Sequence, residues 1–240
     1  NYRHYRWTAK AEKMIKKGAI GKILFFRAGE VLGDAHGGDY FHRWHSDFSV
    51  STGMLNRKAC HHFDMLFWLI KDEPVCASAM GSRIHYTERP DIKHAGRCSK
   101  CSLLKKCPHS IDMDVWDGIY RKMYIDAEHI DGYICDKCVY SDRHTIYDNY
   151  SINLTMKSGV IGNYVLTNFG PREYIFFEIV GDNGSIEAGQ DTLTKKEHLR
   201  IIRHKFSNKR EGILAEGTEA EEFTFDDEGG MHGHGGSDVR

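Results

Sequence analysis

A lysine and a histidine stand three residues apart at the start of a predicted helix. Because residues i and i+3 of a helix lie on the same face, Lys58 and His61 can project together. A small-residue turn, residues 51–53, leads into this helix, and apolar residues at three- and four-residue spacing can anchor its later turns in a core: Phe63, Leu66, Phe67 and Ile70. This arrangement suits proton transfer, with His61 accepting a proton and Lys58 holding an oxyanion or lowering the pKa of the histidine by charge repulsion.

Three neighbours on the same helix have other expected roles. Adjacent histidines point in different directions, so at most one is the proton acceptor, and His62 lies nearer the apolar positions. A helical histidine is also commonly a structural hydrogen-bonding group. We expect Arg57 and His62 to contact the substrate, and Asp64 to orient His61, to pair with Arg57 or simply to be solvated.

A connector upstream of this helix mixes aromatic rings with donors and an acid. Its candidate substrate-binding residues are Asp39, Tyr40, Arg43 and Trp44. Flat rings beside hydrogen-bonding groups suit the faces and hydroxyls of a sugar. Structural packing of the same aromatic side chains is an equally good interpretation.

Five cysteines lie in a polar stretch with little periodicity, at about residues 88–143. Their spacing is Cys98-x-x-Cys101-x5-Cys107, followed by Cys135-x-x-Cys138. Two CxxC pairs in an insert without a core of its own predict a structural zinc site, more than an iron–sulfur cluster, free thiols or disulfides. Four ligands are needed, so either Cys135 or Cys107 completes the set with Cys98, Cys101 and Cys138. A closed four-cysteine site would stabilise the insert and would not catalyse.

Composition excludes several classes of protein. The 240 residues carry a formal net charge of −1, so the chain lacks the excess of basic residues that is typical of nucleic-acid-binding proteins. No apolar run approaches the length of a membrane span and no signal peptide opens the chain, so we expect neither membrane nor secretion. Clustered cysteines favour metal binding in a reducing compartment, and the expected location is cytoplasmic.

Periodicity and turn signals divide the chain into helices and strands. The elements expected before the insert are a helix over 8–17, a strand over 20–31, a connector over 29–49, the lysine–histidine helix and a strand over 75–82. The elements expected after it are strands over 150–156, 160–168, 174–180, 185–187, 199–206 and 222–225. Hairpins after a helix-rich first third indicate the α+β class, with an open, mainly antiparallel sheet and helices on one face. The first six residues resemble the end of a strand and residues 233–238 resemble a helix start, so the chain is expected to be a fragment.

The run from Ser51 to Leu69 resembles the second signature of the glucose–fructose oxidoreductase / inositol dehydrogenase / rhizopine catabolism (Gfo/Idh/MocA) family. In that family a glycine-rich turn leads into a helix with a catalytic histidine, an aspartate three residues later and a Trp-Leu near the end; His61, Asp64 and Trp68-Leu69 match. Residues 1–3, 15–23, 150–184 and 234–238 also fit, so the resemblance covers essentially the whole chain.

The sequence departs from the family pattern at a position that matters. The usual aspartate four residues before the histidine is Arg57, and Lys58 follows it. With the upstream aromatic connector and the cysteine insert, this form resembles a distinct branch of the family. In that branch the resemblance makes Cys98, Cys101, Cys107 and Cys138 the metal ligands.

The resemblance implies a fold and a function for the parent protein. The family joins an N-terminal Rossmann domain, with a glycine-rich dinucleotide loop and a Glu-Lys-Pro motif, to a C-terminal α+β domain; neither motif is in this sequence. Residues 1–240 are therefore expected to be the substrate-binding and oligomerisation half, with NAD or NADP bound mainly by the missing domain.

The function this implies is oxidation of a sugar, polyol or glycoside by hydride transfer, with His61 taking the hydroxyl proton. Two alternatives stay open: redox-neutral cleavage or epimerisation of a glycoside through transient oxidation, and a non-catalytic zinc-stabilised dimerisation scaffold. The expected partners are a sugar-like substrate and a second copy of the chain bound through an uncovered sheet face.

Overall fold

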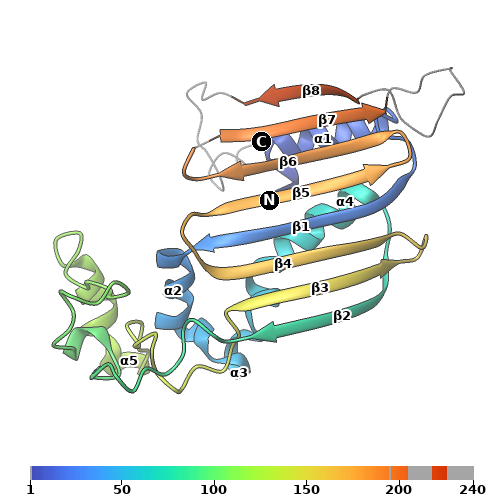
Figure 1. The fold of residues 1–240 in the computed structure, drawn as a ribbon. Coiled ribbons are helices and arrows are strands. Elements are labelled where there is room, and N and C mark those ends of the chain that lie inside the picture. The colour runs from blue at the N-terminus through green and yellow to red at the C-terminus, as the bar shows by residue number, and fades with distance from the viewer. Residues whose placement is uncertain (1, 195, 205–217, 226–240) are drawn as a thin grey trace, which may run out of the picture.

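The centre of the molecule is a sheet of eight strands, seen in a computed structural model that describes residues 2–194, 196–204 and 218–225 (Figure 1). The strands lie in the order β2-β3-β4-β1-β5-β6-β7-β8. Their bounds are β1 Ile23–Gly33, β2 Pro74–Ser82, β3 Asn149–Met156, β4 Ile161–Gly170, β5 Tyr174–Gly181, β6 Gly184–Asp191, β7 Lys196–His204 and β8 Thr218–Thr224. Each neighbouring pair is antiparallel except β1 and β4, which are parallel. The α+β class with an open, mainly antiparallel sheet is confirmed.

Both predicted hairpins form where apolar and polar residues alternate. Burial alternates residue by residue along β3, β4 and β5, so one face of each strand is in the core. The turn between β3 and β4 contains Gly159 at a φ of +89°, a left-handed conformation that favours glycine. Asp182 and Asn183 connect β5 to β6.

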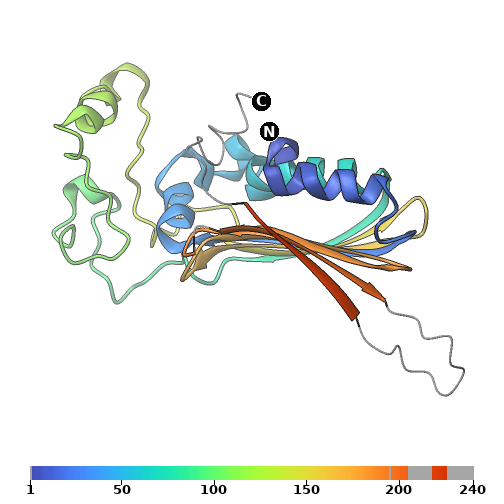
Figure 2. The ribbon, with the colours of Figure 1, turned by 90° about the horizontal axis from the view of Figure 1, so that it is seen from above.

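Two long helices cover one face of this sheet and leave the other face bare in the described part of the chain (Figure 2). They are α1, Arg6–Lys16, and α4, Cys60–Ile70. Large side chains with less than 2% exposure fill the layer between helices and sheet, among them Trp7, Phe26, Leu66, Tyr164 and Phe177. This core holds the start of α4 against the central strand β1, where the site described below lies.

The predicted connector over 29–49 is not irregular, which corrects the sequence-based expectation. It contains the end of β1, α2 (Asp34–His42), the 3₁₀ turn Trp44–Ser46 and the start of α3, Phe48–Ser51. Glycines in the middle of α2 hide its helical character, because glycine is a poor helix former. Gly37 nevertheless has a packing reason, since a Cβ there would collide with the backbone carbonyl of Asn168 at the end of β4.

The cysteine-rich insert extends beyond one end of the sheet as loops with little regular structure (Figure 2). Its longest helices are the π-helical turn Arg121–Ile125 and α5, Glu128–Asp131.

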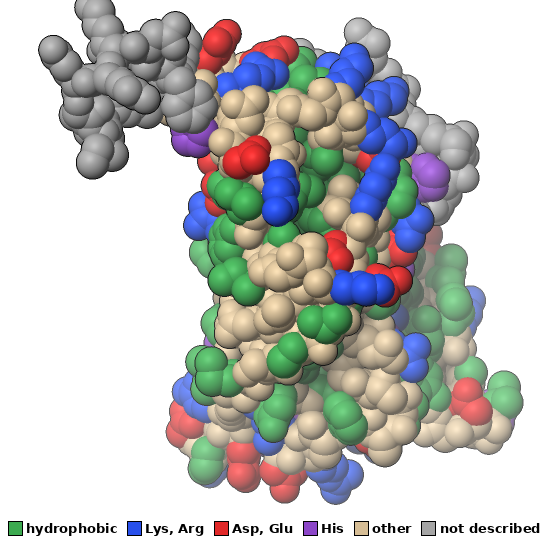
Figure 3. Space-filling view, turned by 90° about the vertical axis from the view of Figure 1, so that its right-hand side faces the viewer, with side chains coloured by type: hydrophobic (Ala, Val, Ile, Leu, Met, Phe, Trp, Pro, Cys, Tyr) green, Lys and Arg blue, Asp and Glu red, His purple; other side chains and the backbone are tan. Residues whose placement is uncertain are grey.

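In the described ranges, no helix has the length and apolar character that a bilayer crossing requires. Hydrophobic and charged side chains are interspersed over the side of the molecule that carries several of the strand turns (Figure 3). The predicted helix start at 233–238 and the end of the strand predicted over 199–206 lie outside the described residues.

Candidate active site

A wide helical turn places Lys58 inside the protein. Leu55–Ala59 form a π-helical turn that runs directly into α4. π-Helical turns within helices are frequent at functional sites. The preceding residues Thr52 and Gly53 both have positive φ, 59° and 83°, which lets the chain turn sharply into the helix. Lys58 is only 7% exposed.

The partner of this buried lysine is a glutamate from the central strand. Glu30 of β1 is 4% exposed, and its Oε1 lies 3.2 Å from Nζ of Lys58. Burial raises the pKa of Glu30, and the Lys58 ammonium opposes that rise. For Lys58, burial alone would lower the pKa, but the charge and hydrogen bond of Glu30 outweigh burial and raise it. The lysine is thus held as an ammonium in the core.

His62 shares the same carboxylate. Its Nε2 lies 3.4 Å from Oε2 of Glu30, and its Nδ1 lies 2.6 Å from the hydroxyl of Tyr164 on β4. The ring is 1% exposed. Burial lowers the pKa of His62 well below 6.5, and the charge of Lys58 lowers it further. The imidazole is therefore neutral, with one ring nitrogen protonated and the other an acceptor.

The expected contact of His62 with a substrate stays a prediction. The structure encloses this ring between Glu30 and Tyr164. Its Nε2 lies near the Glu30 carboxylate without a hydrogen bond to it. Lys58 and His62, four residues apart, therefore form the buried face at the start of the helix.

Tyr2 brings His61 into the same neighbourhood. The Tyr2 ring lies 5.3 Å from that of His61 and 5.1 Å from that of His62, measured between centroids. Nζ of Lys58 donates to the Tyr2 hydroxyl at 3.5 Å. His61 itself is half-buried. Tyr2 thus lies against all three residues of the helix start.

Asp64 has a different partner from the two that the sequence suggested. Its carboxylate pairs with the guanidinium of Arg3, whose Nε donates to Oδ2 at 2.8 Å. The hydrogen bond from Arg3 is the main cause of a lowered Asp64 pKa. Asp64 therefore attaches the N-terminal segment to α4, and Arg3 takes the place that was expected of Arg57.

The aromatic connector forms a second group around α2. Nε of Arg43 donates to Oδ1 of Asp39 at 2.8 Å, and Nη2 of Arg43 donates to the Tyr120 hydroxyl at 3.4 Å. The guanidinium of Arg57 lies 4.9 Å above the Trp44 ring. The structure thus brings four of the expected substrate-binding residues into two pairs, one an ion pair and one a cation–π pair.

Tyr40 connects this outer group with the buried one. Its ring stacks on His36 at 5.6 Å and meets His45 edge-on at 5.0 Å, between centroids. Burial raises the pKa of its phenol; the charge of Lys58 lowers it, while Glu30 and Asp39 raise it. The pKa of Tyr40 therefore depends on charges in both groups.

Four of the five insert cysteines line one small cavity: Cys98, Cys101, Cys107 and Cys138. Cys135 is buried at 3% exposure but is absent from that lining. Burial raises the pKa of the Cys98 thiol to about 11. Among the described residues, no three of these sulfur atoms lie within 4.8 Å of one another, so the geometry stops short of an assembled zinc site.

Sequence reasoning missed Glu30, Tyr2 and Tyr164. Glu30 had a usable signal, because it is an acid within a strand that is otherwise mostly apolar, Ile23–Gly33. A charge in such a strand is rarely buried without a partner. Tyr2 and Tyr164 gave no comparable signal, since both are ordinary core aromatics by composition.

Comparisons with known proteins address the chain as a whole. A family model described as the GFO/IDH/MocA C-terminal domain matches residues 8–187. Over 204 residues the chain is 26% identical to YteT of Bacillus subtilis strain 168, a protein named as an oxidoreductase, covering 79% of this chain and 47% of that protein.

Solved structures of low sequence identity share the fold. Levoglucosan dehydrogenase in complex with NADH and L-sorbose superposes with a TM-score of 0.57 at 19% identity, over 93% of this chain and 45% of that chain. An oxidoreductase domain protein from Kribbella flavida gives 0.57 at 17% identity, over 92% and 46%. The chain therefore spans about half the length of the relatives it matches.

Proposed function

This chain belongs to the GFO/IDH/MocA C-terminal domain family, and from that membership we propose that it is the substrate-binding and proton-transfer half of an NAD(P)-dependent oxidoreductase. The proposed substrates are sugars, polyols or glycosides. The observation that carries the proposal is the Lys58 ammonium, held by buried Glu30 at the start of α4 beside His61. Such a charged group in a poorly solvated place is typical of a site that handles protons.

The residues of this chain have distinct roles in the proposed reaction. Oxidation of a hydroxyl group requires loss of a proton from oxygen and of a hydride from carbon. His61 takes the proton, and Lys58 donates a hydrogen bond to the oxygen as negative charge develops on it. Glu30 keeps Lys58 charged, and neutral His62 lies 3.4 Å from the other carboxylate oxygen. The nicotinamide, when bound, supplies the hydride acceptor.

The described sheet does not offer a dinucleotide site of the usual kind. Dinucleotide-binding folds use parallel strands with crossover helices, and here a single pair, β1 and β4, is parallel in the described part. We therefore place the cofactor mainly on a separate domain of a longer protein. Relatives of about twice the length support this placement, as does the NADH in levoglucosan dehydrogenase.

The outer group is the proposed sugar-binding surface. Asp39, Tyr40, Arg43, Trp44 and Arg57 supply hydrogen-bonding groups beside flat rings, the combination that recognises a sugar face. The fold neighbour levoglucosan dehydrogenase was solved with levoglucosan and with L-sorbose, which supports a carbohydrate as the substrate class.

Replacing the proposed base tests the assignment. In the full-length protein, His61→Ala should lower kcat by about a hundredfold or more, because general base catalysis contributes about 10²–10⁴-fold. His129→Ala, an exposed histidine of the insert, is the matched control and should keep wild-type turnover. Turnover of His61→Ala equal to wild type would remove His61 from the mechanism.

A structural zinc in the insert is part of the proposal. The donor set fits, because Cys98, Cys101, Cys107 and Cys138 are four thiols around one cavity. Metal analysis of purified protein should give one zinc per chain that Cys107→Ser loses. Cys135→Ser should retain it, since Cys135 lies outside that cavity; the reverse pattern would reassign the fourth ligand. The cytoplasmic location stays a prediction.

Self-association through the bare sheet face is also proposed. Apolar side chains on this face gather on the central strands: Phe25, Val31, Ile161, Val165 and Phe176. A surface of this kind is more stable when covered by a second copy. Ion pairs such as Arg27 with Glu178 lie on the same face and would set its register.

A further inference from the structure

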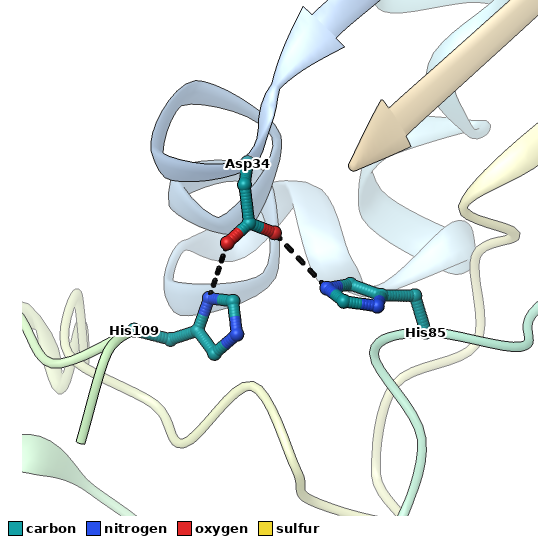
Figure 4. Close-up of side chains that lie close together, drawn as sticks. All are labelled: Asp34, His85 and His109. Atoms are coloured by element: carbon teal, nitrogen blue, oxygen red, sulfur yellow. Dashed lines mark hydrogen bonds and ion pairs between the residues drawn. The ribbon is translucent and has the colours of Figure 1, made fainter. Parts of the chain in front are cut away.

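Three segments far apart in the sequence bring two imidazoles and a carboxylate together at the end of β1 (Figure 4). Asp34 is the first residue of α2, His85 follows β2, and His109 belongs to the cysteine-rich insert. Oδ1 of Asp34 lies 3.0 Å from Nε2 of His85, and Oδ2 lies 3.4 Å from Nδ1 of His109. None of these side chains takes part in the proton transfer proposed above.

The three side chains are close enough to share one ion. The three potential ligand atoms are all within 4.8 Å of one another, which is true of no other trio among the described residues. Two imidazoles and one carboxylate also leave positions on the ion for water or another ligand.

Each of the three residues is oriented by a buried neighbour. The Tyr86 hydroxyl lies 3.0 Å from Oδ1 of Asp34, and Tyr86 has no exposed surface. The backbone N–H of His85 donates to Oδ2 of buried Asp148 at 2.7 Å. The first contact holds the carboxylate of Asp34, and the second holds the backbone of His85.

The backbone at His109 is fixed as well. Nε2 of His42, a buried residue of α2, lies 2.8 Å from the carbonyl oxygen of His109. The side chain of His109 is 7% exposed, while those of Asp34 and His85 are 41% and 39% exposed. The trio is thus anchored in the core on one side and open to solvent on the other, which gives an ion a path of entry.

We propose that Asp34, His85 and His109 bind a divalent transition-metal ion of the kind that takes imidazole and carboxylate ligands. The ion joins the insert to α2 and to the loop after β2, independently of the cysteines. This site is additional to the proposed oxidoreductase function and does not depend on it.

Cobalt(II) is the probe that separates this site from the thiols. Untagged full-length protein, stripped with a chelator, is titrated with Co²⁺ and followed by optical absorption. Thiolate ligands give intense sulfur-to-cobalt charge-transfer bands in the near ultraviolet, whereas imidazole and carboxylate ligands give only weak visible bands. Wild type should show one Co²⁺ per chain that binds without the charge-transfer bands.

Two ligand variants and one control complete the test. His85→Gln changes a side chain that is exposed enough to leave folding intact, and Asp34→Asn keeps the shape of the carboxylate; each should weaken this Co²⁺ by about tenfold or more. His129→Gln, an exposed histidine of the insert, should bind Co²⁺ as wild type does. Wild-type affinity in His85→Gln and Asp34→Asn, or Co²⁺ bound solely with charge-transfer bands, would overturn the proposal and leave the trio as an ion-pair network.

Discussion

Glu30 carries a carboxylate in the middle of the sheet, where an isolated charge would be very costly. It is retained because each of its oxygens faces a partner on the first turns of the neighbouring helix, Lys58 on one side and His62 on the other. The arrangement places an ammonium where the helix begins, without leaving a buried charge unpaired. We infer that Glu30 serves to keep Lys58 protonated.

Removing the glutamate charge tests this inference at the residue scale. Glu30→Gln leaves the Lys58 ammonium buried without a counter-charge, and loss of one partner of a buried pair costs about 3–5 kcal/mol. Urea unfolding should show a loss of this size. Glu178→Gln, which removes a partner of Arg27 on the bare sheet face, is the control and should change the unfolding free energy by less than about 1 kcal/mol.

A double variant separates charge from packing. If Glu30→Gln destabilises through the unpaired ammonium, Lys58→Met in the same chain should recover part of the loss, because both charges are then gone. Additive effects of the two substitutions would show that Glu30 and Lys58 do not interact.

The pKa of His62 predicts a pH dependence of stability. Its folded-state pKa lies well below 6.5, so its contribution to stability is fully present above pH 6.5 and is lost as the pH falls toward the folded value. His62→Gln cannot titrate. Between pH 6.5 and 5, the slope of the unfolding free energy should fall by up to about 1.4 kcal/mol per pH unit in this variant.

The control for this slope is a histidine on the surface. His129→Gln removes an exposed imidazole and should leave the pH dependence of unfolding as it is in wild type. An unchanged slope in His62→Gln would mean that His62 takes up its proton equally in the folded and unfolded states.

At the scale of elements, α2 carries the outer group and depends on close approach to β4. Gly37 has the carbonyl of Asn168 directly where a side chain would lie, whereas a Cβ at Gly38 would meet Tyr86 at 3.6 Å, an ordinary contact. Gly37→Ala should push α2 from the sheet and destabilise the protein by about 1–3 kcal/mol in denaturant unfolding.

The neighbouring glycine is the matched control for this helix. Gly38→Ala should be neutral or stabilise by up to about 1 kcal/mol, because alanine favours the helix and has room. Equal effects of the two substitutions would contradict the close packing of α2 on β4.

The elements show what local pattern can and cannot predict. β3 and β4 alternate strictly and turn at a glycine, so their hairpin follows from the sequence. α2 does not, because glycine is a poor helix former and Gly37 serves packing against a strand more than 120 residues away. The start of α4 was predicted, but its π-helical turn, which directs Lys58 into the core, has no periodic signature.

The residues of the site also differ in how far the sequence predicts them. Lys58 and His61 are recognisable because their spacing is local. The contacts of Glu30 join residues 28 or more apart, and Arg3 reaches Asp64 across 61 residues, so neither contact follows from spacing along the helix. Long-range pairing of this kind is fixed by the strand order of the sheet.

At the scale of the whole molecule, the bare sheet face is the proposed contact between copies. Phe176→Lys places a charge among the apolar residues of β1, β4 and β5 and should lower the molar mass in light scattering to that of the monomer. Lys13→Glu, on the exposed side of α1, is the control and should keep the mass of wild type. A monomeric wild type would contradict the interface.

The central claim is that Lys58 acts in a nicotinamide-dependent oxidation of a carbohydrate, and nicotinamide absorbance in the full-length protein tests it most directly. With NAD or NADP across a panel of sugars, polyols and glycosides, wild type should reduce the cofactor with particular substrates. Lys58→Ala, its fold checked by circular dichroism, should lose about a hundredfold in turnover, while Lys13→Ala should not. Equal turnover in Lys58→Ala and wild type, or product formed without net reduction of the cofactor, would contradict the account.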